Sequence, residues 1–499
     1  MKLSPTTCYQ AVQARDVRYD GRFFTCVKST GVYCRPICPA RTPRLENCLF
    51  VTSAAAAQEA GFRPCLRCRP ESSPSSAAWA GTSAVVSRAL ALIEAGALDE
   101  ASVEALAERL GLGGRHLRRL FMRHLGASPV AVAQTRRVLL AKQLIHQTRL
   151  PMTSVALASG FGSVRRFNET FQRLYMRPPG SLRQQAEESG QWSELSLLLA
   201  YRPPYDWQAM LGFLRQRALL GIELVDADSY QRSIRVGREY GWVRVRQEPG
   251  AHALRAHICV SGLQVLPQVI DRLRCLFDLK ADPQVIRQTL AADPGLAGLL
   301  DKRPGLRLPG GWEPFEVAVR AVLGQQVTVG AGVRLAQNLV ERLAEPVPEA
   351  LRQPGIIRFF PEPAAFVAPA LNGLGMPGAR LATLLHLAET FVREPEWFAR
   401  QADLESTLER WRAIPGIGDW TAQYIAMRAL QETDAIAASD VALQRALGQS
   451  GQRPGVRQVL ARAEAWRPWR AYALMHLWQA DAEGDALPLT EDDRHATVA

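Results

Sequence analysis

The chain has 499 residues, of which 47% are hydrophobic and 22% are charged. This composition is ordinary for globular proteins and excludes wholesale disorder and fibrous architectures, and the length suggests about three or four domains. No stretch approaches the roughly 18 apolar residues of a membrane-spanning helix, and the N-terminus lacks the apolar core of a signal peptide. We therefore expect a cytoplasmic protein without a membrane partner, whose nine cysteines stay reduced.

The positive charge of the chain is concentrated at its N-terminal end. The net charge is +12, and residues 1–190 carry 26 basic against 13 acidic residues, so the remainder is close to neutral. A basic segment of this kind suits a polyanion, because the counterions condensed on the polyanion are released on binding. The charge pattern therefore favours a nucleic-acid partner for the first two-fifths of the chain.

Two polar breaks divide the chain. Residues 71–83 are rich in Ser, Ala and Pro, residues 184–191 are polar, and the sequence between these breaks reads as short helices. Strand-like runs follow a helical stretch at 206–218, and helices with short turns return from about 311 to 480. We therefore predict a multidomain, mainly α protein with one α+β part, divided into 1–73, 82–185, 192–305, 306–482 and a tail at 483–499.

Four cysteines stand in two close pairs. Cys34 and Cys38 lie in CRPIC, and Cys65 and Cys68 lie in CLRC. Each pair can form a chelating turn, and the loop between the pairs supplies the fold, as a tetrahedral zinc site requires. The sequence therefore predicts one zinc ion held by four cysteines, with a purely structural zinc as the alternative to a reactive one. The other five cysteines are expected to be small buried apolar residues.

The segments around these cysteines point to a reactive site. FFTCVKSTGVYCRPICPARTPRLENCLF and AAGFRPCLRCRP resemble the N-terminal domain of the Ada methyl-sensor family over nearly all of residues 5–70. The resemblance implies that Cys34 accepts the methyl group of a methylphosphotriester in DNA. Metal binding keeps a cysteine sulfur deprotonated, and a methylated phosphate is uncharged, so a thiolate can approach it without repulsion. Transfer lowers the negative charge of the zinc centre, which would tighten DNA binding. The resemblance places Thr30, Arg41 and Arg63 near the DNA backbone.

Two segments, 102–125 and 151–175, share one layout about fifty residues apart. Each has an alanine four positions before a glycine, followed by a basic helix; the pairs are Ala107 with Gly111 and Ala156 with Gly160. The alanine lets two helices cross closely, and the glycine supplies the tight turn of a helix-turn-helix. The apolar positions expected to face inward are Leu117, Leu120, Phe121, Phe167 and Phe171.

The two segments are joined by the helical stretch VAVAQTRRVLLAKQLIHQ, and together they resemble the DNA-binding domain of the AraC family. The resemblance implies that each recognition helix enters a major groove of double-stranded DNA, about one turn (~34 Å) apart, at specific promoter sites, with RNA polymerase as a further partner. The alternative is a solvated basic face on an unrelated bundle. The side chains expected to face a groove are Arg115, His116, Arg118, Arg119, Ser163, Arg165, Arg166 and Asn168.

A helical hairpin is the sharpest motif in the second half of the chain. In IPGIGDWTAQYIAMRAL, Gly416 and Gly418 allow backbone amides to turn outward between two short helices. A phosphate can then lie against unpaired N–H groups at a helix N-terminus. Asp440 follows Gly418 by 22 residues. The hairpin and this aspartate, with further similarity over about residues 195–482, resemble the AlkA-type 3-methyladenine glycosylases of the helix-hairpin-helix superfamily.

This second resemblance implies an enzyme that flips a damaged nucleotide out of alkylated DNA and excises the base. Asp440 would stabilise the sugar cation and orient or deprotonate the attacking water. Trp420, Tyr424 and Trp478 would hold a positively charged alkylated purine by stacking. Core packing of the aromatic rings and helix capping by Asp440 are the alternatives. Trp420 stands where lyase-active members carry a lysine, and Gln326 stands where a leucine wedge fills the gap in the duplex.

Together these features predict a bacterial, nucleoid-associated protein of the alkylation response. It would join a zinc-dependent methylphosphotriester sensor and an AraC-type regulator to a monofunctional glycosylase for alkylated purines. A second reading is a transcriptional regulator whose glycosylase half is inactive and only grips DNA, and a third is a zinc-dependent redox sensor. The sequence lacks the Pro-Cys-His-Arg active site of the second Ada methyltransferase domain, so no repair of O6-methylguanine is expected.

Overall fold

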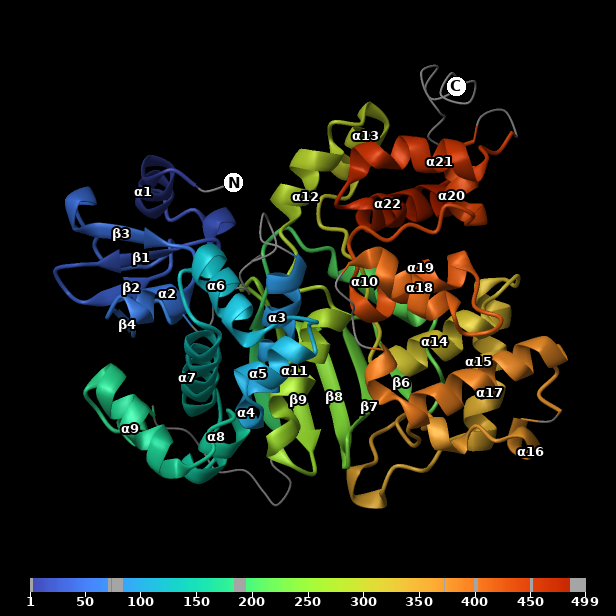
Figure 1. The fold of residues 1–499 in the computed structure, drawn as a ribbon, viewed down its shortest axis with the longest axis horizontal. Helices are drawn as coiled ribbons and strands as arrows, with labels where there is room; N and C mark the ends of the chain where they lie inside the picture. Colours follow the sequence, from blue (N-terminus) through green and yellow to red (C-terminus); the bar gives the residue numbers. More distant parts are fainter. Residues whose placement is uncertain are drawn as a thin grey trace. The chain divides into compact units, whose positions relative to one another are not determined.

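The computed structural model describes residues 3–70, 73, 84–183, 194–371, 373–398, 403–448 and 452–484. The chain, drawn in Figure 1, divides into two compact units. The linkers predicted at 71–83 and 184–191 lie outside the described residues except for Ser73, and so does the tail predicted at 483–499 except for its first two residues. The first unit comprises Met1–Pro203, Ile234–Arg274 and Leu279–Ala281, and the second comprises Pro204–Ser233, Cys275–Asp278 and Asp282–Ala499.

The first unit begins with a small four-stranded sheet of order β3-β1-β2-β4. β1 is buried along its whole length and pairs antiparallel with β2 and β3, whereas β2 and β4 run parallel. Because parallel strands end at the same edge, the residues that follow β2 and β4 emerge side by side. The elements are α1 (Pro5–Gln13), η1 (Val17–Tyr19), β1 (Phe24–Val27), β2 (Val32–Cys34), η2 (Leu45–Asn47), β3 (Cys48–Val51), α2 (Ala54–Glu59) and β4 (Arg63–Pro64).

The helical part that follows contains both predicted helix-turn-helix motifs. Gly111 and Gly160 adopt the left-handed conformation in the two turns, with φ of +71° and +87°. Ser102 and Ser163 cap the first helix of one motif and the second helix of the other, each accepting a hydrogen bond from the backbone N–H three residues on. The helices are α3 (Ala84–Glu94), α4 (Ala97–Glu100), α5 (Val103–Glu108), α6 (Gly114–Leu125), α7 (Pro129–Gln147), α8 (Met152–Ala158), α9 (Val164–Tyr175) and η4 (Pro179–Leu182).

The α+β part contains a five-stranded sheet of order β5-β9-β8-β7-β6, in which β9 pairs antiparallel with β5 and β8, and β6 pairs antiparallel with β7. β5, β8 and β9 belong to the first unit, β6 belongs to the second, and the division between the units falls within β7. The strands coincide with the strand-like runs of the sequence. The elements are β5 (Leu195–Ala200), α10 (Trp207–Arg215), β6 (Glu223–Val225), β7 (Ser229–Val236), β8 (Glu239–Gln247), β9 (Ala253–Val260), η5 (Leu263–Val265) and α11 (Leu266–Leu276).

The remainder of the second unit is helical. Its centre is α14, of which eight of ten residues are buried and which packs against α15, α17 and α19. The elements are α12 (Pro283–Leu290), α13 (Pro294–Lys302), α14 (Pro314–Leu323), α15 (Val329–Leu343), η6 (Glu349–Leu351), η7 (Pro363–Ala365), α16 (Ala368–Leu371), α17 (Gly378–Arg393), η8 (Pro395–Phe398), α18 (Leu404–Arg412), α19 (Asp419–Leu430), α20 (Val441–Ala446), α21 (Val456–Ala463), η9 (Glu464–Trp466) and α22 (Arg470–Glu483).

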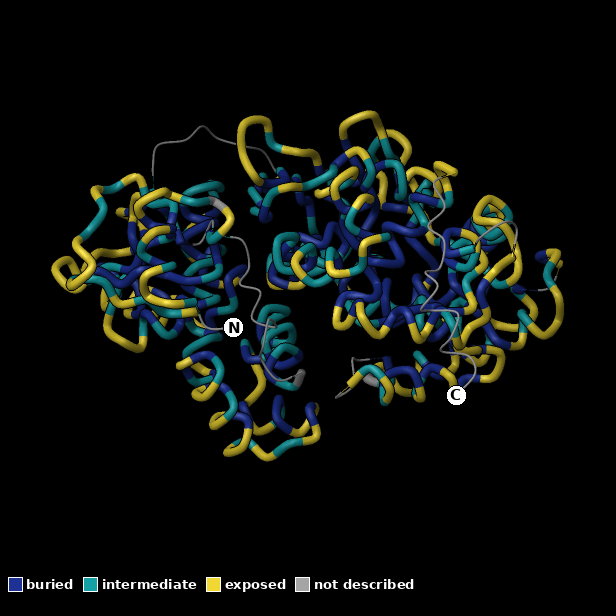
Figure 2. The backbone as a smooth tube through the Cα atoms, turned by 90° about the horizontal axis from the view of Figure 1, so that it is seen from above, coloured by how far each residue is buried: buried dark blue, intermediate teal, exposed yellow. Residues whose placement is uncertain are grey.

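Burial follows the predicted pattern in the recognition helices. Leu117 and Phe121 on α6, and Phe167 and Phe171 on α9, are fully buried, while Leu120 is partly buried against the same core. Exposed positions alternate with buried ones along both helices, and Figure 2 shows the buried positions in the interior of the backbone and the exposed ones along its outside. The predicted fold class, a mainly helical multidomain chain with small sheets, is therefore confirmed. Within the described ranges, no helix is both long enough and apolar enough to cross a membrane.

Candidate functional sites

The two cysteine pairs converge at the edge of the small sheet. Cys34 ends β2 and Cys65 directly follows β4, so the parallel pairing of these strands brings the two residues together. The Cys65 N–H donates to the carbonyl of Tyr33 at 3.0 Å. The four Sγ atoms of Cys34, Cys38, Cys65 and Cys68 lie within 4.8 Å of one another. Three of these side chains are buried and that of Cys38 is half-buried.

The donor set fits zinc. A tetrahedral ion with Zn–S bonds of about 2.3 Å places its sulfurs just under about 4 Å apart, within the spread seen here. The hydrogen bond with Cys38 raises the pKa of the Cys34 thiol, because four adjacent sulfurs cannot all ionise beside one another. A divalent cation removes that repulsion and holds all four as thiolates. The structure therefore supports the predicted zinc site.

A buried ion pair fixes the first cysteine turn. The Arg35 N–H donates to Sγ of Cys68 at 3.3 Å, and the Arg35 guanidinium donates to the carbonyl of Cys68 at 3.2 Å and to Asp20. Asp20 is 2% exposed, so removing Arg35 would leave a buried carboxyl group without this partner. Sequence reasoning missed both residues, because Asp20 lies far from the cysteines and Arg35 reads as one of many surface arginines. Of the other five cysteines, Cys8, Cys26 and Cys259 are buried as expected, and Cys48 and Cys275 are half-buried.

The predicted DNA contacts of the N-terminal part, residues 3–70, which we call the zinc lobe, lie in or next to its loops. Thr30 lies in the turn between β1 and β2, Arg41 lies in the loop after Cys38, and Arg63 begins β4. Thr30 and Arg41 are exposed, and Arg63 is half-buried. These positions are compatible with a ligand at this edge of the sheet.

The predicted groove contacts lie on the outer faces of α6 and α9. Arg115, Arg118, Arg165 and Arg166 are all exposed. Arg118 donates to Glu104 at 2.6 Å, and Arg165 pairs with a glutamate one turn further along α9 at 2.8 Å. Exposed ion pairs contribute little stability, so both guanidinium groups can exchange these partners for phosphate.

Asp440 and the three predicted aromatic residues form one constellation. The Trp420 indole N–H donates to Oδ2 of Asp440 at 2.9 Å, and that of Trp478 donates to Oδ1 at 2.9 Å. Oδ1 also accepts the N–H of Leu443 at 2.9 Å, so Asp440 caps α20 as well. Trp420 and Tyr424 are one helical turn apart on α19, and their rings stack with centroids 5.3 Å apart. The capping alternative and the functional prediction for Asp440 therefore describe the same carboxylate.

These side chains line a cavity of about 740 Å³ in the second unit. Its wall includes Phe213, Arg217 and Trp312, which sequence reasoning did not assign, and the described lining contains no lysine. Arg428, another unassigned residue, lies one turn after Tyr424 and donates to the tyrosine oxygen at 2.8 Å. Burial alone would raise the pKa of Tyr424, but Arg428 and Arg217 lower it below its ordinary value. The lining of the cavity thus combines aromatic rings with guanidinium groups.

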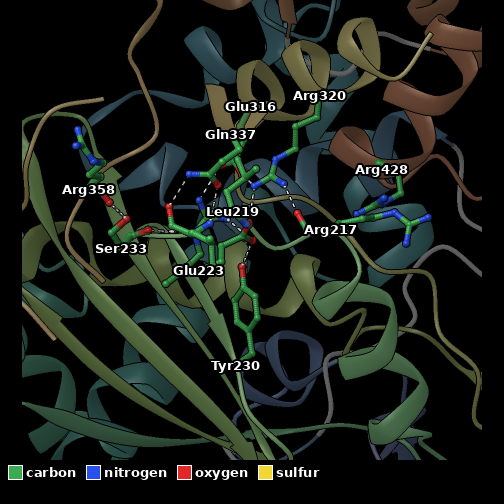
Figure 3. A network of polar contacts seen from close by, with 12 residues as sticks. Arg217, Leu219, Glu223, Tyr230, Ser233, Glu316, Arg320, Gln337, Arg358 and Arg428 are labelled. Atoms are coloured by element: carbon green, nitrogen blue, oxygen red, sulfur yellow. Dashed lines mark hydrogen bonds and ion pairs between the residues drawn. The ribbon is translucent and has the colours of Figure 1, made fainter. Parts of the chain in front are cut away.

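A buried ionic network supports the wall of this cavity (Figure 3). Arg320 on α14 donates to Glu223 on β6 and to Glu316 on α14, both at 2.6 Å, and Arg232 on β7 donates to Glu316 at 2.7 Å. Arg320 also donates to the carbonyl of Arg217 at 2.7 Å. Removing one partner would leave a buried charge unpaired, which is strongly unfavourable. The network therefore fixes the end of α10 against α14.

The predicted hairpin lies between α18 and α19. Gly416 has a φ of +84°, and a Cβ there would lie 1.9 Å from Oγ1 of Thr383, so glycine is required. Gly418 caps α19, and no atom lies within 4 Å of the place a Cβ would take, so its surroundings are open. The Gln325 side chain donates to the carbonyl of Gly416 at 3.0 Å. The next residue, Gln326, is exposed with a φ of +55° beside the hairpin.

Three family descriptions match successive parts of the chain. The metal binding domain of Ada matches residues 7–71, a helix-turn-helix domain matches residues 106–185, and the AlkA N-terminal domain matches residues 196–313.

Two curated relatives and one solved structure are similar to long parts of the chain. The chain is 39% identical over 478 residues, which are 94% of this chain and 95% of the relative, to the probable bifunctional transcriptional activator/DNA repair enzyme AlkA of Mycobacterium tuberculosis. It is 36% identical to DNA-3-methyladenine glycosylase 2 of Escherichia coli, over 57% of this chain and 96% of that protein. The 3-methyladenine DNA-glycosylase from Archaeoglobus fulgidus shares the fold, with a TM-score of 0.50, 20% identity, and coverage of 57% of this chain and 98% of that chain.

Proposed function

Since the chain belongs to the family of bifunctional transcriptional activator/DNA repair enzymes AlkA, we propose a division of labour between its two sites and a role for each residue. The chain joins an Ada-type zinc domain and a DNA-binding helix-turn-helix activator to a DNA-3-methyladenine glycosylase. Its partner is DNA. The observation that carries the assignment of residues is the convergence of Asp440, Trp420 and Trp478 at one cavity.

We propose that Asp440 is the catalytic carboxylate of base excision. As the N-glycosidic bond of a flipped alkylated purine breaks, positive charge develops on the sugar, and a fixed carboxylate stabilises that charge. The two indole N–H groups and the N–H of Leu443 hold the carboxylate in place, which lowers the cost of its orientation in the transition state. Asp440 then orients or deprotonates the attacking water.

The rings of Trp420, Tyr424 and Trp478 hold the extruded base. A 3-methyladenine-type purine carries positive charge in the nucleotide, so electron-rich rings attract it by stacking and cation–π interaction. The cavity volume of about 740 Å³ accommodates a nucleoside. Trp420 offers no amine for a Schiff base, so the product is an abasic site and the strand stays intact.

The hairpin and the loop after α14 bind the damaged strand. The backbone N–H groups of Gly416 and Gly418 and the N-terminus of α19, which Gly418 caps, would receive a phosphate. Gln326, exposed on the neighbouring loop, would fill the gap left by the flipped nucleotide.

Cys34 accepts a methyl group from a methylphosphotriester. Its thiolate sulfur bonds to the methyl carbon, the carbon–oxygen bond breaks, and the phosphodiester leaves as an anion. Cys34 becomes a neutral thioether and is not regenerated. Zinc, when bound by Cys34, Cys38, Cys65 and Cys68, keeps the sulfurs as thiolates at neutral pH. The centre loses one negative charge, which weakens its repulsion from the phosphate backbone.

The first unit also reads DNA. Arg115 and Arg118 on α6, and Arg165 and Arg166 on α9, would contact two major-groove segments at promoter sites. Thr30, Arg41 and Arg63 would contact the backbone near the zinc lobe. A protein that activates transcription also meets RNA polymerase, and we place the chain in the bacterial cytoplasm at the nucleoid.

We assign residues 1–73 to the zinc and methyl-acceptor domain, 82–185 to the helix-turn-helix domain, 192–305 to the α+β domain, 306–482 to the helix-hairpin-helix glycosylase domain and 483–499 to a tail. The matched ranges 7–71, 106–185 and 196–313 support this division.

The intact chain should show two kinetic signatures on methylated duplex DNA. Free 3-methyladenine should accumulate over many turnovers, whereas methyl transfer to the Cys34 peptide, followed by mass spectrometry, should stop at one group per chain. Absence of base release would favour a regulator with an inactive glycosylase half. Response to oxidant without methyl uptake would favour a redox sensor.

A further inference from the structure

A buried lysine connects the zinc lobe to the DNA-binding helices. Lys142 on α7 is fully buried, and its Nζ donates to the backbone carbonyl of the zinc ligand Cys65 at 3.2 Å. The same ammonium lies 5.8 Å from the ring centroid of Tyr175, the last residue of α9. Lysine is rarely buried unless its charge is compensated. One cation therefore contacts both the loop that holds the metal and the second recognition helix.

A second polar connection begins beside the methyl acceptor. Tyr33 precedes Cys34, and its hydroxyl accepts a hydrogen bond from the side chain of Gln58 on α2 at 3.0 Å. The Gln58 carbonyl oxygen accepts the hydroxyl of Thr135 on α7 at 3.2 Å. Thr135 is 6% exposed, so this bond is shielded from water.

Further contacts make the two parts of this unit one packed body. Ser53 at the start of α2 donates to the carbonyl of Leu125, the last residue of α6, at 3.2 Å. Glu59 at the end of α2 accepts both the N–H and the hydroxyl of Ser128, which caps α7, at 3.3 Å. Leu139 on α7 packs against the core of the zinc lobe. An interface with both apolar and polar contacts keeps its geometry, so a change at one side is felt at the other.

The charge of the four-cysteine site makes Lys142 sensitive to methylation. Four thiolates around one divalent cation carry two excess negative charges, and methylation of one sulfur removes one of them. An ammonium held in the low-dielectric interior next to this site loses part of its electrostatic stabilisation when that charge is removed. The contact of Lys142 with the Cys65 carbonyl then weakens relative to its contact with α9.

We propose that Lys142 is the positioning residue through which the methylation state of the four-cysteine site changes DNA binding by the recognition helices. The inference rests on the proposed methyl transfer to Cys34. Lys142 does not touch the reacting atoms; it couples Cys65 to Tyr175, with Gln58 and Thr135 as the second link. A purely structural lysine would instead affect zinc retention or folding, whatever the methylation state.

The test measures affinity before and after methyl transfer. The full chain is fully methylated with methylphosphotriester DNA and repurified, and its Kd for a mixed-sequence duplex of about three helical turns is compared with that of the unmodified chain. The variants are Lys142→Met, which removes the charge and the hydrogen bond to the Cys65 carbonyl but keeps a long apolar side chain, and Thr135→Val, which removes one hydroxyl. Lys302→Met is the control, because Lys302 is half exposed and pairs with Glu483 in the second unit. Zinc content and methyl groups per chain are measured for every variant.

The intact chain and Lys302→Met should bind DNA about tenfold tighter after methylation. Lys142→Met should keep one zinc and take up one methyl group, yet its two Kd values should differ by less than about threefold, because only the direct loss of repulsion between the zinc centre and the phosphates remains. Thr135→Val should fall between these results, and it decides the case if Lys142→Met fails to fold. An unchanged affinity ratio in a folded variant, or loss of zinc and methyl uptake in both variants, overturns the inference. If the intact chain takes up no methyl group, the assignment of Cys34 fails instead.

Discussion

The two sites differ in how the chain builds them. The four-cysteine site comes from two short pairs at the edge of one small sheet, within residues 34–68. The cavity at Asp440 is lined from α10 in the α+β part to α22, over residues 208–482. A nucleophile that is used once, as proposed for Cys34, needs only a reactive sulfur held by local turns, whereas a catalyst that turns over must enclose the substrate and exclude water. The need for enclosure therefore determines how much of the chain a site recruits.

The largest expected effect separates the single-use site from the catalytic one. Cys34→Ala should reduce methyl uptake from one group per chain to none, because no other thiolate occupies that position. Base release should stay within about twofold of the intact chain. Mass spectrometry of the cysteine peptide and chromatography of released bases measure the two activities. Cys48→Ala, at a half-buried cysteine outside the four-cysteine cluster, is the matched control.

The reciprocal change is Asp440→Asn. It should lower the single-turnover rate of base release by at least about a thousandfold, because a neutral amide cannot stabilise the developing sugar cation. Binding to undamaged duplex and methyl uptake should not change. Asp301→Asn, an isosteric change at an exposed ion pair with Arg287, controls for the loss of one charge. Equal rates of base release for Asp440→Asn and the intact chain would contradict the assignment of Asp440 as the catalytic carboxylate.

A double change, Trp420→Phe with Trp478→Phe, separates two roles of the indole rings: orienting Asp440 and stacking on the base. It keeps two stacking rings and removes both N–H donors to Asp440. We expect kcat to fall about 10- to 100-fold with a smaller change in KM, because the carboxylate loses its orientation while stacking persists. If KM rises and kcat is preserved, the indoles act only in base binding.

The last expected effect concerns the stability of the second unit in acid rather than its activity. Burial, followed by the charge of Arg303, lowers the pKa of His476 to about 4. The unfolded chain then binds the extra proton below about pH 6.5, so His476 contributes stability above that pH that is lost as the pH falls towards 4. The loss should approach about 3 kcal/mol. Urea unfolding of His476→Gln should show a flatter decline than the intact chain between these pH values.

A second titrating group, Asp278, requires that the free energy of unfolding be compared between His476→Gln and the intact chain. Burial raises its pKa to about 6, so its contribution to stability runs in the opposite sense, being lost as the pH rises from about 4 to 6. Because Asp278 is present in both chains, its effect cancels in the comparison. Parallel curves for His476→Gln and the intact chain would contradict the prediction.

The sequence predicted the parts of the sites that local spacing defines. The cysteine pairs and the turn glycines Gly111 and Gly160 are short patterns whose geometry follows from neighbouring residues. The roles of Asp440, Trp420 and Tyr424 came instead from the resemblance to AlkA-type glycosylases, because the hairpin glycines indicate a turn but not which side chains meet around a base. Helical spacing adds only that Trp420 and Tyr424 lie one turn apart on α19.

The remainder depends on tertiary contacts that no local pattern carries. Phe213 and Arg217 lie more than 200 residues before Asp440, and only the packing of α10 brings them to the cavity. Lys142 carries a charge that by itself suggests exposure to water, although its side chain is fully buried. Asp20 becomes important because it neutralises Arg35 behind the cysteine turn. Arg428 carried a usable signal, since it follows Tyr424 by one helical turn.

The brevity of β4 has a consequence for cells short of zinc. A strand of two residues cannot hold the CLRC turn against β2 by itself. A zinc ion bound by all four cysteines would supply the missing link between the CLRC turn and β2. The described residues of the second unit contain no comparable cluster of metal-binding side chains. Under zinc starvation we therefore expect base excision to continue while the proposed sensing of methylphosphotriesters is lost. The cell would then repair bases with the amount of glycosylase already present, because methylation could no longer activate transcription.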